Sequence, residues 1–287
     1  MTIPTVTGFF DETTYTVTYV VADPDSGDCA IIDPVLDYNA ASGRTTTDSI
    51  DKIIGFVKAN QLRPVFVLET HVHADHLTGA PALASKFSCP IGIGGRIGDV
   101  QKVFAGIFNT YELATDGSQF DVLLEDGDTF KLGTMEGAVM STPGHTPACS
   151  TYVIGDAAFV GDTLFMPDYG TARCDFPGGD AGVLFDSMGK ILALPESTRL
   201  FFCHDYKAPG RDEFRWESSV REQKTENIHL KNGVSRDEFI AFRNKRDSGL
   251  GMPALIIPSI QVNMRAGELP EPEDNGTTYL KVPVDVL

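Results

Sequence analysis

The sequence lacks the features that mark a membrane or secreted protein. None of the apolar runs in its 287 residues approaches the roughly 18 residues that a membrane-spanning helix needs. Residues 1–10 contain no Lys or Arg and no apolar core, so we expect neither a secretory signal nor a transit peptide. These absences predict a cytoplasmic protein.

Cysteine is scarce and scattered. The five cysteines are an odd number, and no two of them form a Cys-x-x-Cys pair. This pattern argues against a disulfide scaffold and a structural zinc knuckle, and it indicates a reducing compartment.

Positive charge is also in short supply. The chain has 23 Lys and Arg against 40 Asp and Glu, which gives a net charge of −17. A field of this sign repels nucleic acid and anionic membranes, so we expect neither as a partner. An anionic substrate would need a local basic pocket.

The composition and periodicity indicate a mixed α/β protein with a sizeable core, since 42% of the residues are hydrophobic and 22% are charged. Alternating or continuous apolar runs predict strands at 14–21, 29–32, 65–68, 129–132, 137–140, 150–154, 157–160 and 200–202. Helical spacing and capping signals predict helices near 50–57, 79–87, 100–107, 181–194, 216–227 and from the Ser235/Glu238 capping box onward. Because strands and helices do not alternate strictly, we expect layers with mixed sheets. We expect one catalytic domain, residues 1–248, with a C-terminal extension, residues 249–287, packed on it.

Five of the six histidines fall in three short segments, and a fourth segment adds a carboxylate. Each segment follows one of the apolar runs, so buried strands would present these side chains together at one edge of a sheet. The candidate ligands are His71, His73, Asp75, His76, His145, Asp162 and His204.

Imidazole and carboxylate are ligands for zinc or iron, and they leave coordination positions open for water, oxygen or substrate. His71 and His73, two residues apart, are able to face one metal. Asp75 and His76, at the expected start of the next helix, are able to serve a second, with Asp162 between the two. Spacing alone therefore predicts a dinuclear zinc hydrolase, in which a metal-bound hydroxide attacks a carbonyl.

The segment His71–His76 with Gly144-His145, Gly161-Asp162 and His204 resembles the metallo-β-lactamase superfamily over roughly residues 5–230. This resemblance implies an αββα sandwich of two mixed β-sheets flanked by helices, with the metals at the sheet edges. A narrower resemblance, to the bacterial branch of the persulfide (sulfur) dioxygenases related to glyoxalase II, is carried by further segments. These are residues 70–79, 141–147, 170–176, 204–206 and 263–265.

The narrower resemblance implies one Fe(II) per chain, held by His71, His145 and Asp162. The implied reaction is oxidation of glutathione persulfide with O2 to sulfite and glutathione. The other four candidate ligands would then orient groups around the iron. Two alternatives stay open: a thiolesterase of the glyoxalase II type with two zinc ions, and a non-catalytic metal or sulfur sensor.

The resemblance also implies two substrate contacts. Arg173 would pair with a glutathione carboxylate, and Tyr206 would form a hydrogen bond near the sulfur. Lys207 and Arg211 are either further local positive charges or ordinary surface residues. Cys174 is either a reactive thiol or a small buried hydrophobe.

Three remaining features concern shape and assembly. A long loop, Leu36–Thr47, departs from the animal-type pattern and would alter the shape of the pocket. The apolar segment Leu255–Val262 is a candidate interface for a homodimer. Asn227, Asn263 and Arg265 match family positions for which we expect a structural role.

Overall fold

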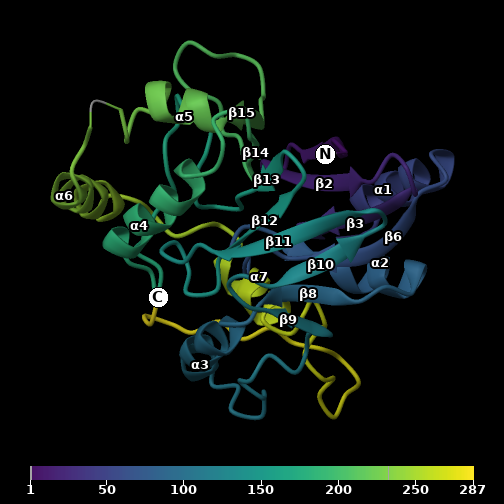
Figure 1. Cartoon of the computed structure of the whole chain (residues 1–287). Coiled ribbons are helices and arrows are strands. Elements are labelled where there is room, and N and C mark those ends of the chain that lie inside the picture. Colours follow the sequence, from purple (N-terminus) through teal and green to yellow (C-terminus); the bar gives the residue numbers. More distant parts are fainter. Residues whose placement is uncertain (1, 232) are drawn as a thin grey trace.

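The computed structural model describes residues 2–231 and 233–287, and two six-stranded sheets form its centre (Figure 1). In the first sheet β1, β2 and β3 pair antiparallel, whereas β3, β6, β8 and β9 run parallel. Its strands, in spatial order, are β1 (Thr5–Asp11), β2 (Thr16–Ala22), β3 (Asp28–Ile32), β6 (Arg63–Leu68), β8 (Ile91–Gly94) and β9 (Val122–Leu124).

The second sheet follows the chain from β10 to β15, and only its β13–β14 pair is parallel. Its strands are β10 (Thr129–Leu132), β11 (Met135–Ser141), β12 (Ser150–Ile154), β13 (Ala157–Phe159), β14 (Arg199–Phe201) and β15 (Glu217–Ser219). A small third sheet has the order β5-β4-β7. Its strands are β5 (Arg44–Thr46), β4 (Val35–Asn39) and β7 (Leu77–Thr78).

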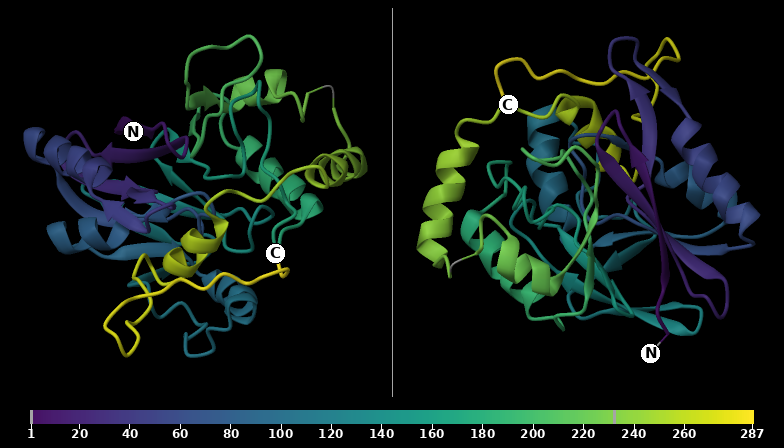
Figure 2. Two further views of the ribbon diagram at one scale, coloured as in Figure 1. Left: turned by 180° about the vertical axis from the view of Figure 1, so that it is seen from behind. Right: turned by 90° about the horizontal axis from the view of Figure 1, so that it is seen from above.

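Helices cover the outer face of each large sheet (Figures 1 and 2). On the first sheet these are α1 (Asp48–Ala59), α2 (Ala80–Phe87), α3 (Ile97–Phe108) and α7 (Ile256–Asn263). On the second they are α4 (Ala181–Leu192), α5 (Val220–Glu226) and α6 (Arg236–Asp247). The two outer layers and the two sheets give the expected αββα sandwich.

Alternating side chains in β2 show how the sequence produces these layers. Val17, Tyr19 and Val21 point into the core between the two sheets. Val20 and Ala22 point to the other face, where they pack under the helices of the first sheet. Because both faces are buried, β2 is apolar throughout its second half instead of alternating between apolar and polar residues.

Most predicted elements form within a few residues of their expected ends, and the Ser235/Glu238 capping box opens α6 as expected. Two expectations were wrong. The segment Trp216–Asn227 begins with strand β15 and becomes helical only at Val220. Asp75 and His76 precede the short strand β7, not a helix. The C-terminal segment, for which no element was predicted, contains the helix α7.

Within the described residues, no helix is both long enough and apolar enough to cross a membrane. The helix α7 also bears on the expected dimer interface, because Ile256, Ile260 and Val262 are buried within the chain itself. These side chains are therefore not available to a second subunit, and a homodimer stays a prediction. The division at residue 248 likewise stays a prediction.

Figure 2 shows the C-terminal segment running from α6 across the molecule to α7, which packs against β7 and α3. At the end of α7, the Asn263 side-chain amide donates hydrogen bonds to the carbonyl oxygens of His73 (2.9 Å) and His76 (2.7 Å). Its Oδ1 accepts a third hydrogen bond from the backbone N–H of Thr78 (2.9 Å). Asn263 thus ties residues 73–78 to the end of α7, which accounts for its expected structural role.

We predict that Asn263→Ala lowers the free energy of unfolding by about 2–4 kcal/mol, because it leaves two carbonyl groups and one N–H buried without partners. Urea unfolding followed by circular dichroism measures the loss. Asn275→Ala is the matched control, since Asn275 is exposed and bonds only within its own turn and to Tyr279. A loss no larger than that of the control would show that Asn263 does not hold the loop.

Candidate metal centre

Four strand ends bring the candidate ligands together. His71 follows β6, His145 follows β11, Asp162 follows β13 and His204 follows β14. Within the second sheet, β11, β13 and β14 run in the same direction, so their carboxyl ends meet at one edge. All seven predicted ligand residues lie around this edge.

The first group consists of His71, His145 and Asp162. The Nε2 atoms of His71 and His145 lie 3.9 Å and 3.7 Å from the same oxygen, Oδ2 of Asp162. These distances are too long for hydrogen bonds. Two ligands that are each about 2.1 Å from a shared ion can be up to about 4.2 Å apart, so the spacing suits a bound metal.

The second group consists of His73, Asp75, His76 and His204. The Oδ2 atom of Asp75 lies 3.3 Å from Nδ1 of His76 and 3.4 Å from Nε2 of His204. The same His204 Nε2 lies 3.4 Å from Oδ1 of Asp162. Asp162 therefore has one oxygen facing each group, as expected for a residue between two metal positions.

Unpartnered polar atoms test whether these residues fit a metal. Buried polar atoms in folded proteins almost always have a hydrogen-bond partner. Besides Oε2 of Glu69, five ligand-type atoms in this cluster are buried without one, and each of these five lies on a predicted ligand. They are Nε2 of His71, Nδ1 of His73, Nε2 of His76, Nε2 of His204 and Oδ1 of Asp162. The donor set therefore fits metal ions.

Two histidines are oriented by backbone carbonyls. His145 Nδ1 lies 2.8 Å from the carbonyl oxygen of Arg173, and His204 Nδ1 lies 3.2 Å from that of Tyr15. Because a carbonyl can only accept, each Nδ1 must carry the proton, and each Nε2 is left free to bind a metal.

Sequence reasoning missed the buried residues that hold the loop of residues 70–76 in place, chiefly Asp33. Its carboxylate accepts hydrogen bonds from the N–H (2.7 Å) and the hydroxyl (2.9 Å) of Thr70, and it lies 3.0 Å from Nε2 of His73. Burial alone would raise the pKa of Asp33, but His73 and the Thr70 donors hold it below its ordinary value. Glu69 adds a second buried carboxylate, 3.3 Å from His73 Nε2. The only sequence signal for this support was an Asp at the end of a buried strand.

Two glycines let the ligand loops pass close to their neighbours. Gly161, with φ +51°, precedes Asp162, and a Cβ there would lie 2.6 Å from Oγ1 of Thr70. Gly144, with φ +136°, precedes His145, and a Cβ there would lie 2.4 Å from Cα of Leu184. Both positions therefore require glycine for backbone conformation and for space.

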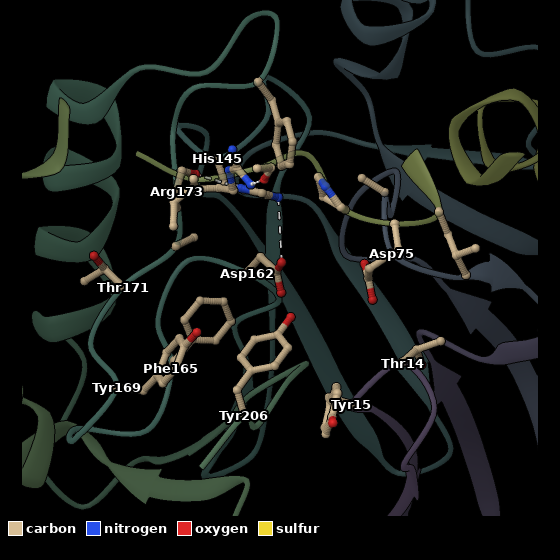
Figure 3. A pocket seen from close by; sticks show the side chains of 18 of the residues that line it. Thr14, Tyr15, Asp75, His145, Asp162, Phe165, Tyr169, Thr171, Arg173 and Tyr206 are labelled. Carbon is tan, nitrogen blue, oxygen red and sulfur yellow. Dashed lines mark hydrogen bonds and ion pairs between the residues drawn. The ribbon is translucent and has the colours of Figure 1, made fainter. Parts of the chain in front are cut away.

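A cavity of about 430 Å³ opens onto the first group (Figure 3). His145, Asp162 and Asp75 line its inner end, and an aromatic wall covers one side. In Figure 3 the Tyr206 hydroxyl is turned toward the Asp162 carboxylate. Phe165, Tyr169 and Tyr206 form this wall and contact one another, whereas Phe176 lies against His145.

Arg173 lies in the wall of this cavity, as expected, but its guanidinium already has partners. Nε and Nη2 each donate to the Asp175 carboxylate at 2.6 Å, and Nη1 donates to the carbonyl of Gly251 at 2.7 Å. Arg211 is likewise held by Asp205 and Asp168, so it is not a free positive charge.

Cys174 is buried, and burial together with the nearby Asp247 carboxylate raises the pKa of its thiol well above the ordinary value. The thiol therefore stays protonated, which favours a small buried hydrophobe over a reactive nucleophile. All five cysteines are unpaired.

Comparisons with known proteins agree with this geometry. The chain is 54% identical to a probable metallo-hydrolase of Burkholderia pseudomallei, over 99% of this chain and all of that one. It is 50% identical to glyoxylase B2 of Dictyostelium discoideum, over 93% and 92% of the two chains. It is 31% identical to the mitochondrial persulfide dioxygenase ETHE1 of Bos taurus, over 90% and 87%. Other relatives at 50% identity are longer, and the chain spans about two thirds of their length.

The crystal structure of ETHE1 from Myxococcus xanthus superposes with a TM-score of 0.74 at 29% identity, and covers 92% of this chain and 100% of that one. Residues 12–204 match the family model of the metallo-β-lactamase superfamily. That range contains six of the seven predicted ligands within it and the seventh, His204, at its end. The chain therefore belongs to the metallo-β-lactamase superfamily of enzymes.

Proposed function

We propose that the protein is a persulfide dioxygenase that uses one Fe(II), held by His71, His145 and Asp162. In the balanced reaction, glutathione persulfide, O2 and water give glutathione, sulfite and two protons. The S–S bond breaks, and the terminal sulfur gives four electrons to O2. The relatives named persulfide dioxygenase and the match to the ETHE1 structure support this reaction.

The observation that carries the proposal is the approach of two histidine Nε2 atoms to a single oxygen of Asp162. Two histidines and one carboxylate on one side of an ion leave the opposite positions open, which is the arrangement of non-haem iron oxygenases. The cavity of about 430 Å³ reaches these residues through His145 and Asp162. Bound iron would supply the one-electron steps by which O2 reacts with the sulfur.

The second group differs from the first in that Oδ2 of Asp75 has hydrogen-bond partners within the chain, Thr16 Oγ1 and His76 Nδ1. Oδ2 of Asp75 lies within 3.4 Å of Thr16 Oγ1, His76 Nδ1 and His204 Nε2. A second ion that bound through this oxygen would have to displace Thr16 and His76 from it. In the proposed enzyme this group orients the iron ligands and lines the site.

The chain's other residues would bind and shield the substrate. The aromatic wall with Phe165 and Tyr169 would keep water from the reacting sulfur. Tyr206 would donate a hydrogen bond to the sulfur end of the substrate. We retain Arg173 as a substrate-facing residue through its position in the wall, although Asp175 occupies its guanidinium.

The same site also suits the alternative, a dinuclear zinc thiolesterase of the glyoxalase II type. The unpartnered Nδ1 of His73 and Nε2 atoms of His76 and His204 favour this alternative. Two of the relatives are named metallo-hydrolase and glyoxylase. Either reaction uses a glutathione derivative. We propose that either takes place in the cytoplasm. We also propose that residues 1–248 form one catalytic domain and that residues 249–287 extend it.

We predict about one iron per chain in protein purified without added metal, together with oxygen uptake on glutathione persulfide. Elemental analysis and an oxygen electrode measure the two quantities on the same sample. Two zinc ions per chain, with thioester turnover and no oxygen uptake, would replace the dioxygenase with the alternative.

We further predict that Asp162→Ala and His76→Ala differ in iron retention. Loss of a group that only orients the iron ligands should weaken iron binding by about 10- to 100-fold, and loss of the shared ligand Asp162 should weaken it by clearly more than that. Competition with a chromogenic chelator measures both, with Asp99→Ala as control, because Asp99 is a half-buried residue of α3 that pairs with Arg96 and lines neither ligand group. Complete loss of metal from the His76 variant would contradict the single-iron site.

A further inference from the structure

A second cavity, also of about 430 Å³, lies beside the metal centre. The strands β4 and β5 of the long loop that distinguishes this sequence form its outer wall, including Tyr38, Asn39, Arg44 and Thr46. His76 lines its inner end. We call this cavity the hairpin chamber, after the β4–β5 hairpin that encloses it.

The hairpin chamber adjoins the cavity that opens onto the first ligand group. Thr13, Thr14 and Leu255 line both cavities and thus form the boundary between them. Asp75 lines the first cavity, and its neighbour His76 lines the hairpin chamber. The metal centre is therefore in contact with both cavities, which lie on opposite sides of Thr13, Thr14 and Leu255.

The acidic side chains of the chamber are occupied by contacts within the protein. Both oxygens of Asp37 accept hydrogen bonds from Ser49, one from its N–H and one from its hydroxyl, at 2.8 Å each. Asp11 accepts from the N–H (2.9 Å) and the hydroxyl (2.7 Å) of Thr14. Both carboxylates therefore already accept hydrogen bonds from neighbouring segments of the chain.

The cation of the chamber, in contrast, is free. Arg44 is exposed, and in the described part of the chain no carboxylate lies within ion-pair distance of its guanidinium. Arg44 is the one Lys or Arg among the residues that line the chamber, so it is the group there that can pair with an anion. A guanidinium fits a carboxylate with two parallel hydrogen bonds.

We propose that the hairpin chamber is a second substrate subsite that takes a carboxylate-bearing arm of the thiol carrier, with Arg44 as its cation. The proposal rests on the proposed function in taking glutathione as the carrier, which the alternative thiolesterase shares. Glutathione has its sulfur on the middle residue and a carboxylate toward each end. With the sulfur at the metal centre, one arm occupies the first cavity, and the other crosses Thr14 and Leu255 into the chamber.

Isothermal titration of reduced glutathione into the metal-loaded enzyme tests the subsite. Glutathione is a product of both candidate reactions, so its dissociation constant is independent of which reaction the enzyme catalyses. We expect Arg44→Ala to raise this constant about fivefold and Arg44→Glu to raise it further, whereas Arg44→Lys keeps most of the affinity. Lys102→Ala, an exposed cation on α3 that lines neither cavity, is the matched control.

Glutathione diethyl ester, which lacks both carboxylates, tests the chemistry of recognition. We expect the wild-type enzyme and Arg44→Ala to bind the ester with equal affinity. Unchanged glutathione binding by Arg44→Ala and Arg44→Glu would overturn the subsite. An equal loss for glutathione and its ester would also overturn it, because Arg44 would then not act on a carboxylate. Neither result changes the metal content or the oxygen uptake, which test the proposed function separately.

Discussion

The cost of burying a cluster of imidazoles and carboxylates is the constraint on which the rest of this structure depends. Removing a polar group from water costs free energy unless the group finds a hydrogen-bond partner or a metal ion. Here five ligand-type atoms find none within the protein. The fold must therefore hold these atoms toward one another and leave their stabilisation to a metal. The supports around the cluster follow from that requirement: carbonyls that fix His145 and His204, the carboxylate of Asp33, and the amide of Asn263.

These supports come from elements that are far apart in the sequence. Asp33 directly follows β3, Asn263 ends α7, and Tyr15 lies in the turn between β1 and β2, yet all contact the ligand loops. The metal centre thus joins both sheets and the C-terminal helix. A change in any one of these supports would reach the ligands through a single hydrogen bond. This arrangement explains why the site requires the whole sandwich and not only the four ligand segments.

The elements that could be predicted are those whose hydrophobic pattern is visible within a few residues. The elements that were missed depend on pairing with strands that are distant in the sequence. Buried strands such as β12 and amphipathic helices such as α1 show their periodicity within a few residues. By contrast, β1 is half-buried and β15 is polar, so pairing with neighbouring strands decides both. The ligand residues were predictable because they cluster in short motifs. Asp33 was not, because its partner Thr70 lies 37 residues away and only the parallel pairing of β3 with β6 brings the two together.

The number of metals depends on a competition within the second ligand group. An ion that binds Oδ2 of Asp75 must displace the hydrogen bonds of this oxygen with Thr16 and His76. In the first group, the two Nε2 atoms are 3.7–3.9 Å from Asp162 Oδ2, so an ion there displaces no hydrogen bond. The first position should therefore fill before the second whatever the metal. Occupancy of the second position then depends on two opposing terms. Metal bonds to the unpartnered nitrogen atoms of His76 and His204 favour it, and loss of the hydrogen bonds at Asp75 opposes it. A soft, carboxylate-bearing substrate that spans both cavities would favour the single ion, because it needs the open side of the first position and the space beside His76.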